Sequence, residues 1–413
     1  LSFEMHHRFS DPVKKWWPEK GSVDYYRALA DHDRILHGRR LLTFSEGNTT
    51  VRISSLGFLH YTSITLGTPG MDFLVALDTG SDLFWVPCDC SQCPHFEFSI
   101  YSPSTSSTSN KVPCNNNLCQ SGCSGSSHCP YKVAYVSADT SSSGILVEDV
   151  LHLETEDEDV SVPIIFGCGQ VQTGSFLDVA APNGLFGLGM EKISVPSILS
   201  SKGLTVDSFS MCFGRDGIGR ISFGDKGSSD QEETPFNLRP TYNISVVEIR
   251  VGTTVDTNFS ALFDTGTSFT YLRDPAYTRL SESFNSQAHN NRDPKIPFEY
   301  CYYMSSTENI SRIPSISLTM KGGGQFSILD PIIVIFTRVE YVYCLAVVKS
   351  QDLNIIGQNF MTGQRVVFDR ERHVLGWKNF NCYNTEDDVS LPIHPRNSPP
   401  AVAAEPDRYT PEA

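Results

Sequence analysis

Short apolar runs separated by turn residues dominate the chain from about residue 57 to residue 383. The runs are rich in Val, Ile, Phe and Tyr, as in FLHYTSITLG, VPIIFG, NISVVEIRVG and QRVVFD, and they alternate with Gly, Ser, Asn and Pro. This pattern is typical of all-β barrels and sandwiches. Residues 195–201 and 275–286 are predicted helices, but no segment with helical periodicity is long enough to dominate. We therefore predict a mainly β protein.

The two ends of the chain have a different composition. Residues 1–55 carry nine Lys or Arg against seven Asp or Glu, and a short helix is predicted from Ser22 to Gly38, followed by Arg39 and Arg40. One interpretation is a solvated helix with two surface arginines. The other is a prosegment that lies over an acidic cleft and is removed near the dibasic pair. The tail, residues 384–413, is rich in Pro and Ala and is predicted to be disordered.

Charge and hydropathy exclude some classes of partner. The formal net charge of the 413 residues is −15, which argues against nucleic acid or an anionic membrane as the main partner. No apolar stretch reaches the length of about 18 residues that a membrane-spanning helix needs. The eleven histidines show no metal-ligand spacing, so we expect neither a metal nor another cofactor.

The twelve cysteines and four N-x-S/T sequons point to the secretory pathway. Cys90 and Cys93 have the spacing of zinc ligands, but an even cysteine count beside four sequons favours disulfides and glycosylation. The chain starts at Leu1, and we take a signal peptide as already removed. The sequons lie at Asn48, Asn243, Asn258 and Asn309. The cysteines are Cys88, Cys90, Cys93, Cys114, Cys119, Cys123, Cys129, Cys168, Cys212, Cys301, Cys344 and Cys382.

One phrase, an apolar run ending in Asp-Thr-Gly, occurs twice. FLVALDTGSDLFWV spans residues 73–86 and ALFDTGTSFTYL spans residues 261–272. Each Asp follows a β run, so each is expected at a strand end, where Gly lets the backbone turn tightly. Two apolar-apolar-Gly segments, 185–187 and 355–357, are predicted to thread beside these turns and to hold them rigidly. Alignment of the two phrases matches Asp78, Thr79, Gly80 and Ser81 with Asp264, Thr265, Gly266 and Thr267.

Two carboxylates brought together on an approximate two-fold axis cannot both ionise easily. Like charges a few ångströms apart raise one pKa strongly, so the pair holds one shared proton. The ionised partner can take a proton from water while the protonated partner hydrogen-bonds a carbonyl oxygen. This is general acid–base hydrolysis of a peptide without a covalent intermediate. Single Asp-x-Gly triplets are usually turns, and it is the repeat that favours catalysis by Asp78 and Asp264.

These motifs resemble those of the pepsin-like aspartic proteases, over roughly residues 57–383. The resemblance also rests on WVPCDCSQC at 85–93, FGCG at 166–169, GLFGLG at 184–189 and VVFDRERHVLGW at 366–377. It is strongest to the plant nepenthesin-like subgroup, which has a cysteine-rich insertion in its first lobe. It implies a bilobal double β-barrel with pseudo-two-fold symmetry and a catalytic cleft between the lobes.

The resemblance also implies domains and supporting residues. The expected domains are a prosegment at 1–55, a first lobe at 56–240 with its insertion at about 88–129, a second lobe at 241–383 and the tail. The flap tyrosine is matched by Tyr135, with Trp85 as its neighbour and Tyr131 as the competing assignment. Relatives have a Gly-rich turn after this tyrosine, whereas residues 136–139 here read Val-Ser-Ala-Asp, which predicts a stiffer flap tip.

Disulfide pairing is implied only in part. By resemblance Cys301 pairs with Cys344, and Cys212 with Cys382, while the eight cysteines from Cys88 to Cys168 match the insertion in number and leave their connectivity open.

The expected function is an acid endopeptidase made as a zymogen. Its partners would be protein or peptide substrates, and we expect a monomer that is secreted to the cell surface or extracellular space, or sent to the vacuole. Some relatives carry a lipid anchor after a Pro-rich tail. The alternative is a catalytically silent protein of this fold that binds or inhibits another protein. Such relatives lose one catalytic triplet, and both are intact here.

Overall fold

The computed structural model describes thirteen stretches of the chain. They are residues 2–5, 60–93, 99–120, 122–123, 127–135, 140–154, 159–178, 183–214, 219–237, 240–288, 298–303, 313–336 and 341–382. Several predictions lie outside them. These are the helix at 22–38, Arg39 and Arg40, the sequons at Asn48 and Asn309, the flap tip at 136–139 and the tail.

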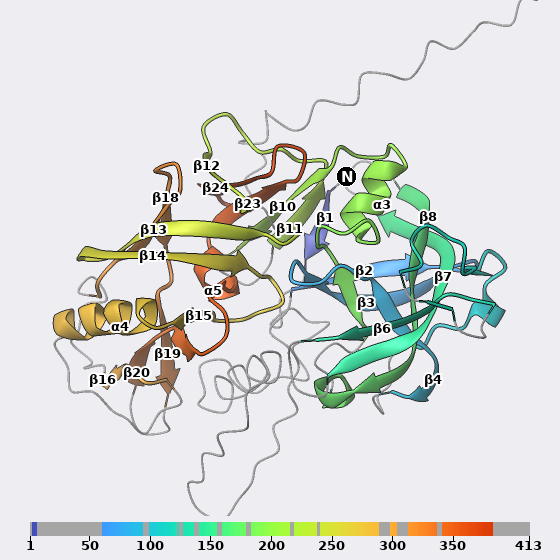
Figure 1. The fold of residues 1–413 in the computed structure, drawn as a ribbon, viewed down its shortest axis with the longest axis horizontal. Helices are drawn as coiled ribbons and strands as arrows, with labels where there is room; N and C mark the ends of the chain where they lie inside the picture. The colour runs from blue at the N-terminus through green and yellow to red at the C-terminus, as the bar shows by residue number, and fades with distance from the viewer. Residues whose placement is uncertain are drawn as a thin grey trace, which may run out of the picture.

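The described residues form two β lobes side by side, so the prediction of a mainly β, bilobal protein is confirmed (Figure 1). An eight-stranded sheet builds the first lobe, in the order β2-β3-β9-β4-β8-β7-β5, with β6 paired to β7. Its strands are β2 (Tyr61–Leu66), β3 (Met71–Asp78), β4 (Trp85–Gln92), β5 (Asn110–Lys111), β6 (Pro130–Ala134), β7 (Ser141–Glu154), β8 (Asp159–Thr173) and β9 (Leu185–Gly187).

The second lobe contains a seven-stranded sheet in the order β18-β17-β13-β14-β22-β15-β21 and a three-stranded sheet, β16-β20-β19. The larger sheet is made of β13 (Asn243–Val251), β14 (Thr253–Phe263), β15 (Thr270–Arg273), β17 (Ile316–Met320), β18 (Gln325–Ile328), β21 (Val347–Ser350) and β22 (Ile355–Ile356). The smaller one is made of β16 (Cys301–Tyr303), β19 (Ile332–Phe336) and β20 (Tyr341–Leu345).

A six-stranded sheet, here called the interlobe sheet, joins the lobes in the order β1-β11-β10-β23-β24-β12. Its strands come from three distant parts of the chain: β1 (Ser2–Met5), β10 (Ser208–Phe213), β11 (Gly219–Phe223), β12 (Glu232–Pro235), β23 (Gln364–Asp369) and β24 (Val374–Asn379). Strand β1 falls within the predicted prosegment and pairs antiparallel with β11 at the sheet edge.

Helices are few in the described residues, as the sequence predicts. They are α3 (Val195–Ser201), α4 (Ala276–Gln287) and α5 (Gln358–Met361), with short 3-10 turns η1 (Pro103–Thr105) and η2 (Gly174–Asp178). The two predicted helices correspond to α3 and α4. Helix α4 buries Tyr277, Leu280 and Phe284, which are three or four positions apart and so share one face.

The two lobes repeat one arrangement of strands around the predicted turns. Strand β3 runs parallel to β9, with Asp78 opposite Gly187, and β14 runs parallel to β22, with Phe263 opposite Ile356. The strand that follows each turn pairs antiparallel with the neighbour of the strand before it. In the first lobe β4 pairs with β9, and in the second lobe β15 pairs with β22. Both Asp-Thr-Gly turns therefore lie at corresponding strand ends.

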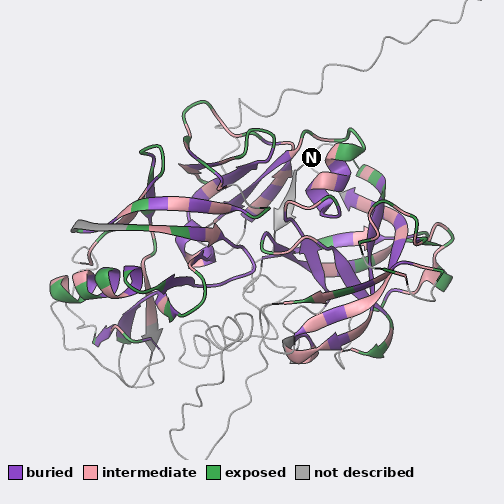
Figure 2. Ribbon diagram, in the orientation of Figure 1, coloured by how far each residue is buried: buried purple, intermediate pink, exposed green. Residues whose placement is uncertain are grey.

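Buried residues concentrate on the strands (Figure 2). Most belong to one cluster that continues from each lobe into the interlobe sheet, and each lobe holds a smaller cluster beside it. Burial alternates along β17 and β18, which is the pattern of strands with one face on a core. Phe209 and Phe368 stack at the centre of the interlobe sheet with ring centroids 4.8 Å apart, and Tyr242 packs edge-on against Phe368. Aromatic packing therefore ties the lobes to the shared sheet.

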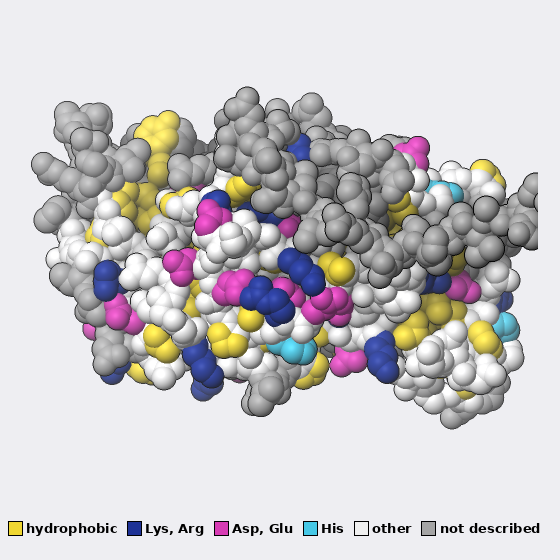
Figure 3. Space-filling model, turned by 90° about the horizontal axis from the view of Figure 1, so that it is seen from above, with side chains coloured by type: hydrophobic (Ala, Val, Ile, Leu, Met, Phe, Trp, Pro, Cys, Tyr) yellow, Lys and Arg dark blue, Asp and Glu magenta, His cyan; other side chains and the backbone are white. Residues whose placement is uncertain are grey.

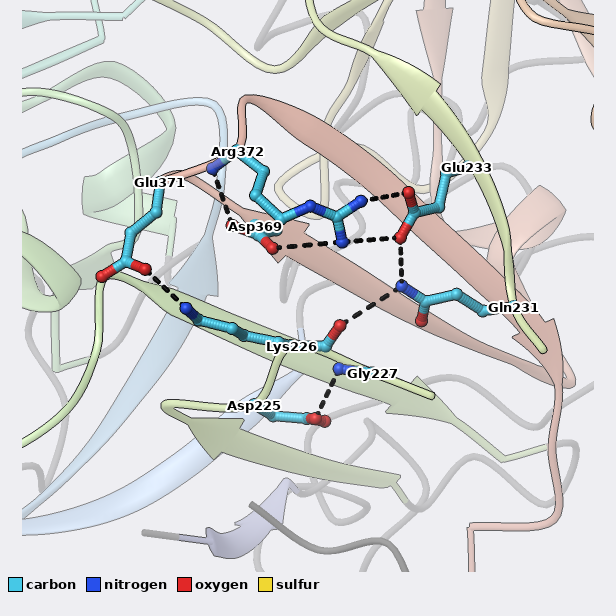
Figure 4. Close-up of polar contacts among 8 residues, drawn as sticks. All are labelled: Asp225, Lys226, Gly227, Gln231, Glu233, Asp369, Glu371 and Arg372. Atoms are coloured by element: carbon cyan, nitrogen blue, oxygen red, sulfur yellow. Dashed lines mark hydrogen bonds and ion pairs between the residues drawn. The ribbon is translucent and has the colours of Figure 1, made fainter. Parts of the chain in front are cut away.

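The outer face of the interlobe sheet carries interspersed acidic and basic side chains (Figure 3). Lys226, in the β11–β12 connection, pairs with Glu371 at 2.5 Å, and Glu233, on β12, pairs with Arg372 (Figure 4). Both pairs end on the β23–β24 turn. Exposed pairs of this kind contribute at most about 1 kcal/mol each. A buried pair between Arg365 and Asp225 lies close by within the same sheet.

All twelve cysteines form disulfides. In the second half of the chain Cys301 is joined to Cys344, and Cys212 to Cys382. The eight cysteines whose connectivity the sequence leaves open are joined as Cys88–Cys168, Cys90–Cys93, Cys114–Cys123 and Cys119–Cys129. Among the described residues there is no helix long and apolar enough to cross a membrane.

Loop lengths predict which disulfide matters most for stability. The Cys212–Cys382 bond spans 170 positions and Cys90–Cys93 spans three. On chain-entropy grounds, replacing both Cys212 and Cys382 by Ala should lower the free energy of unfolding by about 3 kcal/mol more than replacing Cys90 and Cys93. Urea unfolding of the two double variants measures this difference, and equal losses would contradict it.

Candidate active site

Both predicted aspartates lie at strand ends beside the opposite lobe. Asp78 is the last residue of β3, and Asp264 directly follows β14. The backbone N–H of Leu188 donates to the carbonyl of Asp78 at 2.9 Å, and the N–H of Asp264 donates to the carbonyl of Ile356 at 3.1 Å. The apolar-apolar-Gly segments thus bind the two turns through their backbones.

The two threonines of the triplets bind each other's turn across the lobe boundary. The N–H of Thr79 donates to Oγ1 of Thr265 at 3.1 Å, and the N–H of Thr265 donates to Oγ1 of Thr79 at 3.0 Å. Each hydroxyl in turn donates to a carbonyl of the opposite strand, Thr79 to Phe263 at 3.1 Å and Thr265 to Leu77 at 3.0 Å. These four buried hydrogen bonds are here called the threonine lattice.

Each carboxyl group is oriented by its own turn. For Asp78 the donors are the N–H of Gly80 at 2.8 Å and the hydroxyl of Ser81 at 2.5 Å. For Asp264 they are the N–H of Gly266 at 2.8 Å and the hydroxyl of Thr267 at 2.7 Å. The supporting residues of the repeat therefore surround the two carboxyl groups in matching positions.

The glycines of the triplets allow the two carboxyl groups to approach. A Cβ on Gly80 would lie 2.7 Å from an oxygen of Asp264, and one on Gly266 would lie 2.5 Å from an oxygen of Asp78. Real Cβ atoms do not come this close to an oxygen, so each position accepts only Gly without displacing the opposite carboxyl. The carboxyl groups thus face each other over the paired turns.

The electrostatics of the pair favour one retained proton. Asp78 is 7% exposed and Asp264 is 8% exposed. Burial, and then the neighbouring Asp264 carboxyl, together raise the pKa of Asp78 to about 7, against the lowering effect of the Ser81 and Gly80 donors. A carboxyl group that keeps its proton near neutrality beside a second carboxyl group is suited to general acid–base chemistry.

Tyr135 and Trp85 lie together beside the pair. The indole N–H of Trp85 donates to the hydroxyl of Tyr135 at 2.7 Å, and Phe176 packs edge-on against both rings at 5.0 Å. Burial, and then the nearby Asp78, raise the pKa of Tyr135 well above its usual value, so this hydroxyl stays protonated. The competing residue, Tyr131, shares a hydrogen bond with Ser142 at 2.8 Å instead of bonding Trp85.

A cavity of about 310 Å³ opens beside Asp78, between the first catalytic turn and Tyr135. Its lining combines polar and charged residues, among them Ser81, Asp82, Lys132, Tyr135 and Glu191, with apolar side chains that include Leu83, Leu146 and Ile193. The cavity is therefore placed to hold a side chain of a peptide bound at the two carboxyl groups. Among the residues that the structure describes, no cluster of His, Cys, Asp or Glu has the arrangement of a metal site.

Sequence analysis did not single out three contributors to this site. Phe176 supports the Trp85–Tyr135 pair from a short 3-10 turn, and Gln358, one residue after the second apolar-apolar-Gly segment, donates to the carbonyl of Thr265. His60 accepts the N–H of Leu77 and contacts Gln358. Of these three residues, only Gln358 could have been suspected from the sequence, because it lies next to the repeat. The partners of Phe176 and His60 are remote from them in sequence.

The chain is similar to known proteins over most of its length. Residues 60–225 match the sequence-family model described as "Xylanase inhibitor N-terminal", and residues 241–379 match "Xylanase inhibitor C-terminal". The chain is 53% identical to "Aspartyl protease family protein 1" of Arabidopsis thaliana, over 98% of this chain and 87% of the relative. It is 38% identical to "Aspartic proteinase-like protein 1" of the same plant, over 95% and 83%.

Among solved structures, basic 7S globulin from soybean has the same fold, with a TM-score of 0.63 at 23% identity. The match covers 79% of this chain and 94% of the globulin.

The raised pKa of Asp78 predicts how stability depends on pH. Because the folded protein keeps a proton that the unfolded chain loses above the ordinary pKa of 3.8, stability should fall as the pH rises from about 4 to about 7. Asp78→Asn stays neutral at every pH, so it should remove a loss of stability on the order of 4 kcal/mol. Urea unfolding at several pH values measures this.

The matched control for this experiment is Asp352→Asn, which removes one carboxylate at an exposed position. It should keep the wild-type slope. If Asp78→Asn and wild type lost stability equally over this range, the retained proton on the pair would be contradicted.

Proposed function

Because the chain belongs to the pepsin-like aspartic protease family, we propose that it is an aspartic endopeptidase that hydrolyses peptide bonds at acidic pH. The observation that carries this proposal is the facing pair of buried carboxyl groups, Asp78 and Asp264, each with its own donors. Protein or peptide chains are the substrates that the neighbouring cavity and flap tyrosine suit.

The pair supports hydrolysis by one shared proton. With one carboxyl ionised and one protonated, the ionised group removes a proton from water, and the oxygen of that water attacks the scissile carbonyl carbon. The protonated group meanwhile donates a hydrogen bond to the carbonyl oxygen. Activity requires this proton, so it should decline as the pH rises through about 7, where Asp78 loses it.

We also propose that the enzyme belongs to the nepenthesin-like plant subgroup. Support comes from the insertion after β4, where Cys114–Cys123 and Cys119–Cys129 close two short loops, and from the Cys88–Cys168 bond that fastens β4 to β8. Disulfides at this density suit an oxidising compartment. This supports secretion to the cell surface or extracellular space, with the vacuole as the other acidic destination.

The proposed domain division follows from the same family. Residues 1–55 would be the prosegment, cut near Arg39 and Arg40, and residues 56–240 and 241–383 would be the two lobes. The described part of the proposed prosegment, β1, pairs with β11 at the edge of the interlobe sheet.

A second candidate function is a catalytically silent binding protein. It is favoured by the descriptions of the two matching family models, which name xylanase inhibitors. Both catalytic triplets and both sets of donors are intact in this chain, which favours the protease. Processed protein that cleaves no substrate but binds a xylanase tightly would support the silent alternative.

The mechanism predicts the effect of removing either carboxyl. Asp78→Asn and Asp264→Asn should each lower the rate of hydrolysis of denatured globin at acidic pH by about a thousandfold or more, because the amide neither takes a proton from water nor shares one. Pepstatin should block the wild-type activity. Asp352→Asn is the matched control and should keep it. Near-normal turnover by either active-site variant, with circular dichroism showing an intact fold, would contradict the shared-proton mechanism.

Secretion predicts glycosylation at an accessible sequon. The side chain of Asn258 lies on an exposed part of β14, whereas the Asn243 side chain is half-buried and accepts a hydrogen bond from Asn237 at 2.5 Å. Peptide mapping by mass spectrometry of protein secreted from plant cells should find a glycan on Asn258 and none on Asn243. A bare Asn258 in secreted protein would count against this assignment.

A further inference from the structure

Two polar aromatic residues, His60 and Tyr242, occupy equivalent positions in the two lobes, next to the strands that lead into the catalytic turns. His60 directly precedes β2, the first strand of the first lobe, and Tyr242 directly precedes β13, the first strand of the larger sheet of the second lobe. The carbonyl of His60 accepts the N–H of Leu77 at 2.8 Å, and the carbonyl of Tyr242 accepts the N–H of Phe263 at 2.9 Å. Leu77 and Phe263 each immediately precede a catalytic aspartate.

The side chains of these two residues both cross to the other lobe. Nδ1 of His60 lies 2.8 Å from Oε1 of Gln358, and the hydroxyl of Tyr242 donates to the carbonyl of Leu188 at 2.6 Å. Gln358 and Leu188 are also equivalent, since each follows the glycine of an apolar-apolar-Gly segment. His60 is 4% exposed and Tyr242 is fully buried, so both bonds are shielded from water.

The His60 contacts close a ring of hydrogen bonds. From His60 the ring runs to Leu77 through the backbone, and the carbonyl of Leu77 accepts the hydroxyl of Thr265. The carbonyl of Thr265 accepts Nε2 of Gln358, whose Oε1 returns to His60. Because an amide oxygen only accepts, Nδ1 of His60 carries the hydrogen in this bond.

The Tyr242 contacts close a second ring. The carbonyl of Phe263 accepts the hydroxyl of Thr79, and the adjacent Asp78 carbonyl accepts the N–H of Leu188 at 2.9 Å. The carbonyl of Leu188 then accepts the hydroxyl of Tyr242. Each ring therefore contains one hydrogen bond of the threonine lattice and one side chain that spans the lobes.

We propose that His60 and Tyr242 are positioning residues, which fix the separation and relative tilt of the two catalytic turns through these paired rings. This rests on the proposed function, because the quantity they would control is the geometry of Asp78 and Asp264 in hydrolysis. Neither residue touches the carboxyl groups in any described hydrogen bond. A displacement of about 1 Å at a reacting group can lower a rate by about a hundredfold, so small movements of the turns are sufficient.

Single-atom and ring-preserving variants test the proposal. Tyr242→Phe removes only the hydroxyl, and His60→Phe keeps a ring but removes the donor. Each should lower kcat by about ten- to a hundredfold and leave KM within about twofold, because substrate contacts are unchanged. His60→Asn, whose side-chain N–H₂ can replace Nδ1, should recover kcat to within about threefold of wild type.

A matched control separates positioning from stability. Tyr302 is also buried and donates its hydroxyl to Asn285 at 2.8 Å, and both of these residues belong to the second lobe. Tyr302→Phe should lower Tm about as much as Tyr242→Phe but leave kcat within about twofold. The proposal is overturned if Tyr242→Phe keeps wild-type kcat, or if Tyr302→Phe lowers kcat equally.

The pH dependence of stability tests the positioning role without relying on hydrolysis, so this test is distinct from the test of protease activity. Loss of a bond from a hydrogen-bond ring should let the two carboxyl groups separate. The pH dependence of stability between about pH 4 and 7 should therefore become smaller in Tyr242→Phe and stay unchanged in Tyr302→Phe. The titratable groups that face Asp78 are Asp264, Asp82 and Tyr135, and neither variant alters them. A wild type without pepstatin-sensitive cleavage would contradict the proposed function, whereas an unchanged pH dependence in Tyr242→Phe would contradict the positioning role.

Discussion

The structure depends on keeping two carboxyl groups close together in a site that is almost closed to water. Their mutual repulsion and the cost of burial both oppose this, as the raised pKa of Asp78 shows. The opposing constraint is the threonine lattice, in which Thr79 and Thr265 each bond two backbone groups of the other lobe. Since these bonds are neutral and buried, they hold at any pH at which the protein is folded.

The rest of the fold prevents the lobes from separating around this lattice. The interlobe sheet takes strands from both halves of the chain, and its aromatic core and the buried Arg365–Asp225 pair join β10, β11 and β23. The Cys212–Cys382 bond then fastens the end of the second half to β10. The interlobe sheet thereby fixes the two lobes relative to each other, and with them the two Asp-Thr-Gly turns.

The sequence predicted what depends on local pattern and repetition. The duplicated Asp-Thr-Gly phrase indicated the two turns, the apolar runs indicated the strands, and the spacing of apolar residues indicated α3 and α4. It did not predict contacts between remote residues. His60 and Gln358 are 298 positions apart, and Phe176 meets Trp85 and Tyr135 only because β4, β6 and the turn after β8 converge. The pairing of the eight cysteines from Cys88 to Cys168 needed the loop geometry for the same reason.

The threonines hold the two turns together, whereas the aspartates supply the carboxyl groups. These separate roles explain why the fold of this family does not depend on its activity. The contacts that hold the turns together come from Thr79, Thr265 and the backbone, and the lattice includes no carboxyl oxygen. The aspartates add an electrostatic cost and are supported by donors that would also bond an asparagine oxygen. A relative that loses one aspartate therefore keeps the fold and gains stability near neutral pH, which makes conversion into a silent binding protein physically easy. This chain keeps both aspartates, both glycines and both hydroxyl donors against this cost, which supports the proposed hydrolysis.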